Sequence, residues 1–371
     1  MFLDVRKVKG PDATEIFISA VPTTSESAIV QATEIFSGIK DVLSENNAKI
    51  FQERIFGTED SLMHALIARA EIYGVLNDGV EPACLKVPVG FKGPISGLQV
   101  HAFAGYGSLE SVIFEGKACG RIFITNGKKY LTISGLQADT ENIAPEEINQ
   151  ILRKCDAILN KYGGNFQCVP RTWMWLGNIL EWYNEFNAVR TAFFINKGLI
   201  RKGVLSKMPA STGIGIGPSG KKKCAVDLVA VIAPIGSIKY FESGGKQNSA
   251  YEYGSSFSRA CSAMTPAGET FYISGTASID KYGHTVYCDD TNAQIDATVQ
   301  NVIAILNQLG CTPDDIAHSL AYCKNAEIEK LFCEKYSNSG WPCITMIADI
   351  CRDNLLFEIE VTAIKKSVNC N

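Results

Sequence analysis

Three arginines stand among aromatic or apolar neighbours rather than in charged stretches: Arg171, Arg190 and Arg259. A guanidinium keeps its charge when it is desolvated and can bind a carboxylate through two parallel hydrogen bonds. These side chains could therefore bind a ligand that carries carboxylate groups. The alternative for any one of them is a structural ion pair. Tyr183 lies two helical turns before Arg190 on the same face of an expected helix, where it could hydrogen-bond the ligand or simply pack.

A candidate acid lies near the end of the chain, where apolar and acidic residues alternate. Phe357 and Ile359 face one side of an expected strand, and Glu358 and Glu360 face the other. A carboxyl group whose pKa is raised by burial stays protonated near neutral pH and can act as a general acid. Glu358 is the candidate for this role. The alternative is a strand glutamate exposed to solvent.

A candidate nucleophile, Cys351, lies seven residues before Glu358. A two-residue turn at Asp353 and Asn354 would pair Cys351 with Leu356 and put its thiol on the face of Glu358. A thiol in such a place can act as a nucleophile. The alternative is an inert core thiol, which is what we expect for most of the other cysteines.

Two further motifs carry no cofactor chemistry in this context. Residues 215–220 fit the pattern G-x-G-x-x-G, but a dinucleotide site needs that motif between a strand and a helix. Here an apolar segment that reads as a strand follows, at 224–232, so we predict a hairpin turn. The lysines at 221–223 are expected to be a solvated turn. None of the 13 cysteines forms a Cys-x-x-Cys pair and the 4 histidines are scattered, so neither a metal nor another cofactor is expected.

Composition excludes several classes of function. The 371 residues are 46% hydrophobic, which suggests two to three domains, and the net charge of −4 is spread without a strongly basic half. No nucleic-acid partner is therefore expected. The N-terminal residues lack the long apolar segment of a leader peptide, and no apolar stretch reaches the roughly 18 residues of a membrane span. We expect a cytoplasmic protein without a membrane partner, whose cysteines are reduced.

One series of elements occurs three times along the chain. The expected order is a strand, a helix, a strand, a helix and two closing strands. The copies cover 16–20, 28–42, 49–56, 62–73, 83–89 and 98–103; then 131–135, 148–159, 166–175, 179–194, 210–216 and 224–232; then 271–275, 291–309, 316–323, 326–336, 343–350 and 355–364.

Single positions recur as well. The first strands share Ser19, Ser134 and Ser274, and the closing pairs begin at 82–83, 209–210 and 342–343. One position of the last strand is expected to be Gln99, Asp227 and Glu358. We predict an α/β fold of three modules, at 1–106 (degenerate), 107–240 (with the arginines) and 241–371 (with the glutamate). Because each sheet needs a partner for its second face, the three should close on one another as an intrachain pseudo-trimer and function as a monomer.

The third copy resembles the RidA/YjgF family at 272–275, 293–306 and 357–361. In that family, active sites lie between subunits and the first Glu of the last strand reaches the ligand, which corresponds to Glu358. The family's ligand-binding Arg on the preceding strand has no counterpart at 342–345. This departure argues against ordinary imine deaminase activity.

The middle of the chain resembles chorismatases at 171–173, 186–190 and 209–215, and at 256–260 leading into 274–278. The resemblance implies cleavage of the enolpyruvyl ether of chorismate to pyruvate and a hydroxybenzoate or dihydroxycyclohexadienoate. It implies Glu358 as the acid, and Cys351 as a nucleophile in the hydroxybenzoate-forming type. The substrate-binding residues that it implies are Arg171, Tyr183, Arg190, Thr212, Gly213 and Arg259.

Two other functions stay open at this point. The chain could be a RidA-like protein that binds a small carboxylate without catalysis, or a deaminase of reactive enamines or imines. In each case the partner is a small molecule. The cluster of arginines favours the chorismatase hypothesis. We expect Arg171, Arg190 and Glu358 to meet in one cleft between the second and third copies.

Overall fold

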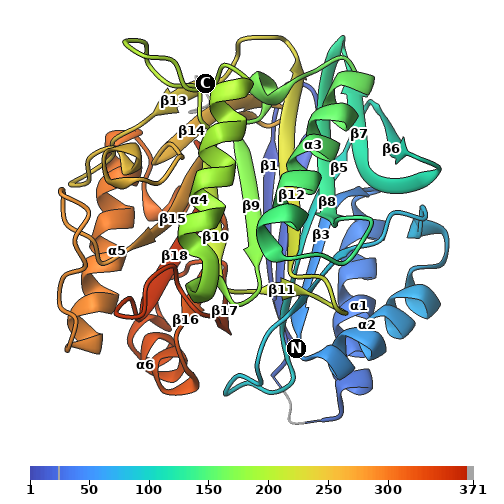
Figure 1. Cartoon of the computed structure of the whole chain (residues 1–371). Coiled ribbons are helices and arrows are strands. Elements are labelled where there is room, and N and C mark those ends of the chain that lie inside the picture. The colour runs from blue at the N-terminus through green and yellow to red at the C-terminus, as the bar shows by residue number, and fades with distance from the viewer. Residues whose placement is uncertain (24–25, 366–371) are drawn as a thin grey trace, which may run out of the picture.

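The computed structural model describes residues 1–23 and 26–365, in which three six-stranded sheets form (Figure 1). The first sheet has the strand order β1-β2-β5-β3-β4-β11, and its last strand, β11 (Gly217–Pro218), comes from the middle of the chain. Its other elements are β1 (Phe2–Lys9), β2 (Thr14–Val21), α1 (Ala28–Glu45), β3 (Lys49–Gly57), α2 (Glu59–Tyr73), η1 (Gly74–Leu76), β4 (Ala83–Lys86) and β5 (Ile95–Ala104).

The second sheet has the order β10-β9-β12-β8-β7-β6. Its elements are β6 (Ser108–Phe114), β7 (Lys117–Thr125), β8 (Lys128–Leu136), α3 (Ala144–Lys161), η2 (Phe166–Cys168), β9 (Arg171–Leu176), α4 (Ile179–Asn196), β10 (Ala210–Ile214) and β12 (Cys224–Ala233).

The third sheet has the order β13-β14-β15-β18-β16-β17. Its elements are β13 (Lys239–Phe241), η3 (Ala250–Tyr253), β14 (Ala260–Thr265), β15 (Gly268–Ala277), α5 (Thr291–Gln308), η4 (Pro313–Asp315), β16 (Ile316–Cys323), α6 (Ala326–Tyr336), β17 (Cys343–Ile347) and β18 (Phe357–Ile364).

Five strands of each sheet follow one pattern. The orders β1-β2-β5-β3-β4, β7-β8-β12-β9-β10 and β14-β15-β18-β16-β17 match strand for strand. In each, the last pair is parallel and the other pairs are antiparallel. The predicted fold class, three α/β modules in tandem, is confirmed. The domain boundaries at 106 and 240 stay a prediction.

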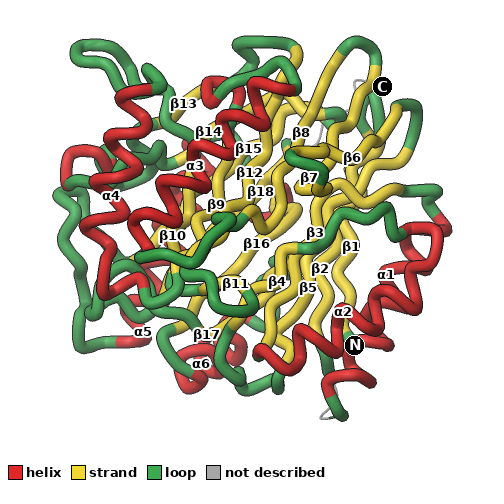
Figure 2. Tube along the Cα trace, turned by 45° about the vertical axis from the view of Figure 1, so that its right-hand side comes forward, coloured by secondary structure: helices red, strands yellow, loops and turns green. Residues whose placement is uncertain are grey.

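The helices lie on the outside and the sheets face one another at the centre, as Figures 1 and 2 both show. Each helix pair buries an apolar stripe on its own sheet; in α3 this stripe includes Ile148, Ile151, Leu152 and Cys155. A further core joins the inner faces of all three sheets, with Phe56, Trp175 and Tyr322 among its members. Among the described residues, apolar side chains on the inner face of each sheet are thus buried against the other two sheets.

Among the described residues, no helix combines the length and the apolarity that crossing a membrane requires.

The strand register identifies equivalent positions in the three modules. The repeated serines are Ser19, Ser134 and Ser274. The residues opposite them are Gln99, Asp227 and Glu360, the last two across a bulge in β8 and β15. The prediction that put Glu358 in this set is therefore wrong by two residues. Alternation leaves Glu358 and Glu360 on one face, so the sequence pattern alone does not separate them.

These equivalent residues connect each module to the one before it. Asp227 forms an ion pair with Arg54 of β3, with 2.6 Å between Oδ2 and Nε. Glu360 forms one with Arg171 of β9, at 2.8 Å. Gln99 closes the ring, since its Nε2 donates to the carbonyl of Ser319 in β16 at 3.2 Å. The contacts repeat around the molecule, as the predicted pseudo-trimer requires.

Two predicted hairpins are wrong. β10 and β12 do not pair, because β9 lies between them, and residues 217–218 instead pair with β4 of the first sheet. Likewise β17 and β18 are separated by β16, so Cys351 does not pair with Leu356 across a two-residue turn. In both cases a helix crossover places a parallel strand at the edge, and the last strand is inserted in the interior of the sheet.

Candidate active site

One cavity lies between the second and third modules, next to α4. Its wall contains six of the predicted site residues: Tyr183, Arg190, Gly213, Arg259, Cys351 and Glu358. They come from α4 and β10 of the second module, and from the residue before β14, the loop before β18 and β18 itself in the third. Residues as distant in sequence as Tyr183 and Glu358 are therefore neighbours because the modules pack together. The sequence predicts that Arg171, Arg190 and Glu358 meet in one cleft. Arg190 and Glu358 both line this cavity, whereas Arg171 does not.

Arg190 is a buried cation without a carboxylate partner among the described residues. Its Nη2 donates to Oδ1 of Asn187 at 2.7 Å, and Asn187 in turn donates to the carbonyl of Tyr183 at 3.0 Å. The guanidinium also lies 4.6 Å from the centroid of the Phe186 ring. Burial lowers the pKa of Arg190, and its Nε is buried without a hydrogen-bond partner among the described residues. A buried cation with free donors favours an anionic ligand.

Arg259 enters the same cavity from the start of β14. Its Nε donates to the carbonyl of Asn248 at 3.0 Å and its Nη2 to the hydroxyl of Tyr253 at 2.7 Å. Arg352, on the loop before β18, donates from Nη1 to the carbonyl of Gly283 at 2.5 Å. Within residues 1–23 and 26–365, neither guanidinium has an acidic partner. Together with Arg190 they give the cavity three positive groups.

Glu358 is the acidic group in the cavity wall, and only 5% of it is exposed. It faces Gly275, where an added Cβ would lie 2.1 Å from Oε1 of Glu358, so any larger residue would collide with the carboxyl group. Burial, and next the charge of Glu360, raise the pKa of Glu358 to about 8, against the opposing effect of Arg171 and Arg259. The carboxyl group is therefore protonated at neutral pH and can donate a proton.

Cys351 lines the cavity through the loop between β17 and β18. Burial, and next the charge of Glu358, raise the pKa of its thiol to about 12, although Arg352 lowers it. The neutral thiol is the dominant form near neutral pH, and a thiol is a poor nucleophile compared with a thiolate.

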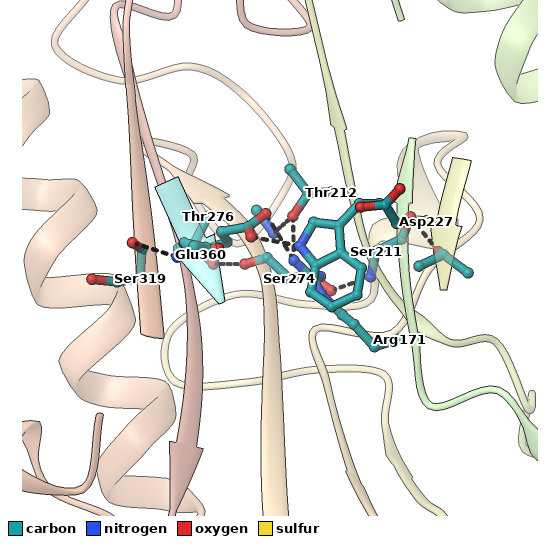
Figure 3. A network of polar contacts seen from close by, with 12 residues as sticks. Arg171, Ser211, Thr212, Asp227, Ser274, Thr276, Ser319 and Glu360 are labelled. Carbon is teal, nitrogen blue, oxygen red and sulfur yellow. Dashed lines mark hydrogen bonds and ion pairs between the residues drawn. The ribbon is translucent and has the colours of Figure 1, made fainter. Parts of the chain in front are cut away.

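Arg171 and Thr212 lie beside this cavity rather than in its lining. Nη2 of Arg171 donates to Oγ1 of Thr212 at 2.7 Å and to Oε2 of Glu360 at 2.8 Å (Figure 3). Thr212 Oγ1 also accepts from the backbone N–H of Gly275, at 3.1 Å. Arg171 is thus paired with a buried carboxylate, and its direct contact with a substrate stays a prediction.

The other two interfaces lack this chemistry. By register, Ala225 and Gly97 occupy the place of Glu358. Ala225 lines a second cavity, between the first and second modules, together with Ser134 and Gly135. At the interface between the third and first modules, the Ile344 side chain packs against Gly97. Only one of the three interfaces therefore carries an acid at this position.

In the other two modules, the position equivalent to Arg259 holds a residue that is not a cation. Ala260 pairs with Ile273, just as Gly120 pairs with Ile133 and Val5 with Ile18. The residues before them are Arg259, Cys119 and Asp4. The acid and this arginine thus occur together at one interface only.

Sequence reasoning missed several residues of the cavity wall, including Tyr253, Ser255, Gly275 and Arg352. The hydroxyl of Ser255 lies 3.2 Å from that of Tyr183. Tyr253 and Ser255 belong to the segment 253–255 that precedes the 256–260 motif, so an extension of that motif could have found them. Gly275 lies inside the motif 274–278 but was not singled out there. Arg352 directly follows Cys351 and precedes the predicted turn at 353–354, and the sequence pattern there does not single it out. Among the described residues, no group of three or more His, Cys, Asp or Glu side chains is arranged to hold a metal ion.

The chain was compared with known proteins. No protein-family model matches it, and neither does a curated protein. A crystal structure of chorismatase matches with a TM-score of 0.59 and 16% identity, over 95% of this chain and 99% of that one. A Rid-family protein from Yersinia pestis matches 34% of this chain and 98% of its own, at 21% identity and a TM-score of 0.28. Yeast Mmf1 matches 35% of this chain and 99% of its own, at 18% identity and a TM-score of 0.28. From the first of these matches, we conclude that the chain has the chorismatase fold, in which three α/β modules form one pseudo-trimer.

Proposed function

We propose that the chain is an enzyme that cleaves the enolpyruvyl ether of chorismate and releases pyruvate. The observation that carries this proposal is a cavity that combines a protonated Glu358 with three arginines, none of which has a carboxylate partner among the described residues. Chorismate is a dianion with an enol ether, so it needs both features at once. The likeness to chorismatase supports the fold on which this site is built.

Arg190 and Arg259 are proposed to bind the two carboxylates. Each retains donor groups that the described residues leave free, and each is fixed in place by neutral partners, Asn187 for one and Tyr253 for the other. A neutral partner orients the guanidinium without cancelling its charge. Arg352 is only half-buried and would neutralise the ligand on the solvent side. Tyr183 can add a hydrogen bond from its hydroxyl group.

Glu358 is proposed to start the reaction by protonating the methylene carbon of the enol. The C=C electron pair forms the new C–H bond, the ether carbon becomes an oxocarbenium ion, and Glu358 becomes a carboxylate. Water then adds to that carbon and returns a proton to Glu358. The resulting hemiketal breaks its bond to the ring oxygen, which takes the hydroxyl proton and leaves as an alcohol. The products of this route are pyruvate and a dihydroxycyclohexadienoate.

The alternative product is a hydroxybenzoate, which forms with pyruvate and without net addition of water. Cys351 is the group that could direct this route by attack on the ring, but the thiol must first lose a proton. Its raised pKa makes that step unfavourable in the ligand-free protein. Glu358 is therefore proposed to supply the first proton in either route, and chromatography of the ring product distinguishes the two routes.

The test is incubation with chorismate, followed by an assay for pyruvate and chromatography of the ring product. Glu358→Gln should lower pyruvate release by roughly 10²–10⁴-fold, the usual contribution of general acid catalysis, while calorimetry shows that chorismate still binds. Glu269→Gln, which changes a carboxylate at the far end of β15, is the control and should keep normal turnover. Binding of chorismate without pyruvate release in the unchanged protein would instead identify a non-catalytic carboxylate-binding protein.

A further inference from the structure

We propose that Glu360 is a positioning residue for the acid Glu358. Arg171 and Trp173 anchor the carboxylate of Glu360 across the module boundary. This carboxylate keeps Glu358 protonated, and the hydrogen-bond partners of Glu360 fix the backbone against which Glu358 lies. The proposal rests on the function proposed for Glu358. Glu360 itself lines a different cavity, whose wall contains residues of all three modules, and it is absent from the wall of the cavity proposed to bind the substrate.

Both oxygens of Glu360 are held by the second module. Oε2 accepts from Nη2 of Arg171 at 2.8 Å, and Oε1 accepts from Nε1 of Trp173 at 2.6 Å. The carboxylate is 6% exposed and the guanidinium 1%. Since β9 supplies both donors and β18 supplies the acceptor, the charge of Glu360 is fixed only when the two modules are docked. Both oxygens of Glu360 thus accept a hydrogen bond, whereas Nε and Nη1 of Arg171 are buried without a hydrogen-bond partner among the described residues, so the pair is held through Nη2 alone.

The same network reaches the backbone beside Glu358. The Nη2 atom of Arg171 that binds Glu360 also binds Oγ1 of Thr212, and this oxygen accepts from the N–H of Gly275. Gly275 is the residue that leaves room for the Glu358 carboxyl group. Three residues thus connect the anchored carboxylate to the wall of the acid's own pocket.

The negative charge of Glu360 also favours the protonated form of Glu358. Glu358 and Glu360 are two residues apart on one face of β18, both buried, so ionisation of Glu358 would put two negative charges close together at low dielectric. After burial, this repulsion is the largest cause of the raised pKa of Glu358. Arg171 and Arg259 act in the opposite direction and lower the pKa of Glu358, and Glu360 compensates the charge of Arg171.

The experiment follows the titration of Glu358 without substrate. Infrared spectra are recorded across the pH range for the wild-type protein and for Glu358→Gln, and their difference isolates the protonated-carboxyl band of Glu358. In the wild-type protein this band should vanish near a pH of about 8. In Glu360→Gln it should vanish at least about one pH unit lower, because the repulsion is lost and Arg171 is left uncompensated.

The matched control is Asp227→Asn. Asp227 occupies the equivalent position in the second module and pairs with the buried Arg54, but the residue two positions before it is Ala225, not an acid. This variant disturbs a similar buried ion pair and should leave the titration of Glu358 unchanged. A Glu358 titration that is unmoved by Glu360→Gln, or moved equally by Asp227→Asn, overturns the proposal.

A second variant keeps the test valid if Glu360→Gln does not fold. Arg171→Met combined with Glu360→Gln removes both charges of the pair, so it leaves no buried cation without a partner. The titration of Glu358 should then lie below that of the wild-type protein, because the repulsion by Glu360 is lost; a value at or above that of the wild type overturns the proposal. Because no substrate is used, a failure of chorismate cleavage is detected separately and does not affect this result.

Discussion

At the scale of single residues, two buried arginines of the second module differ in their partners. Arg171 is paired with Glu360, whereas Arg190 has only neutral hydrogen-bond partners among the described residues. The charge of the first arginine is compensated, so its removal alone would leave Glu360 buried without a cation. The second is a cost to the empty protein that an anionic ligand would offset. In the sequence, both arginines have apolar or aromatic neighbours, and only the fold shows that their hydrogen-bond partners differ.

Arg190→Met should therefore raise the melting temperature of the ligand-free protein and weaken chorismate binding by roughly 10- to 100-fold, the range expected for a lost charged hydrogen bond. Arg171→Met should do the opposite to stability: it leaves Glu360 buried without its cation and should cost about 3–5 kcal/mol. Thermal melting and calorimetry measure the two effects. If both variants are equally destabilised, Arg190 has a compensating partner and the argument for an anion site fails.

Glu358 gives the protein a defined pH dependence. Its pKa is about 8 in the folded protein and close to 4.5 as a free side chain, so between these values the folded state holds a proton that the unfolded state has lost. Its contribution to stability is therefore full below the lower value and is lost as the pH rises through about 8. Glu358→Gln should remove this dependence and be more stable than the wild-type protein at high pH.

Pyruvate release should fall over the same upper range, because the ionised form of Glu358 cannot donate a proton. Melting curves and initial rates at a series of pH values check both halves of the prediction. An activity that instead increases steadily above the pKa would show that the reaction needs the carboxylate rather than the acid.

At the scale of elements, the strand pair β15 and β18 creates the pocket for the acid. The bulge in β15 brings Gly275 opposite the Glu358 carboxyl group, at a distance that excludes a side chain. Gly275→Ala would put a methyl group 2.1 Å from Oε1 of Glu358, so the carboxyl group must turn away. We expect a large loss of pyruvate release with a folded protein.

The double variant Gly275→Ala with Glu358→Asp provides the complementary test. The shorter acid withdraws from the new methyl group by one methylene, so it should be more active than Gly275→Ala alone. Pyruvate assays and melting curves compare the two proteins. Equal activity in Gly275→Ala and the wild type would show that the carboxyl group does not need the place it has in this structure.

Most elements could be predicted from the sequence because their periodicity is strong. The row of apolar residues in α3 and the alternation in β18 define the two elements. The strands β1, β6, β7, β13 and β14 escaped prediction. The edge strands β1, β6 and β13 have exposed faces that give little apolar signal. The hairpins predicted around 215–220 and 353–354 were wrong, because chain neighbours need not be sheet neighbours.

The site was predictable in its residue types but not in its pairing. Six predicted residues line one cavity, yet the partner of Arg171 lies 189 residues away along the chain. The two glutamates of β18 are equivalent in any alternating pattern, and only their register with β15 and the donors of β9 separates their surroundings. Such information lies in long-range contacts, which no local pattern contains.

At the scale of the whole molecule, the proposed site is complete only when the second and third modules are docked. Glu358 and Arg259 come from the third module, and Arg190 and Tyr183 come from the second. Fragments 1–240 and 241–371 should therefore release no pyruvate separately and should regain activity when they are co-expressed and associate. Size-exclusion chromatography and the pyruvate assay test this. Activity in fragment 241–371 alone would contradict a site shared between modules.

The unequal interfaces set the binding stoichiometry. A symmetric trimer of identical subunits would repeat its site three times and could bind three ligands with cooperativity. Here Ala225 and Gly97 stand where a second and third acid would be. Saturation should thus require one chorismate for each chain of 371 residues, along a hyperbolic isotherm. With a single occupied interface, the described residues offer no second acid-bearing interface through which occupancy could be communicated.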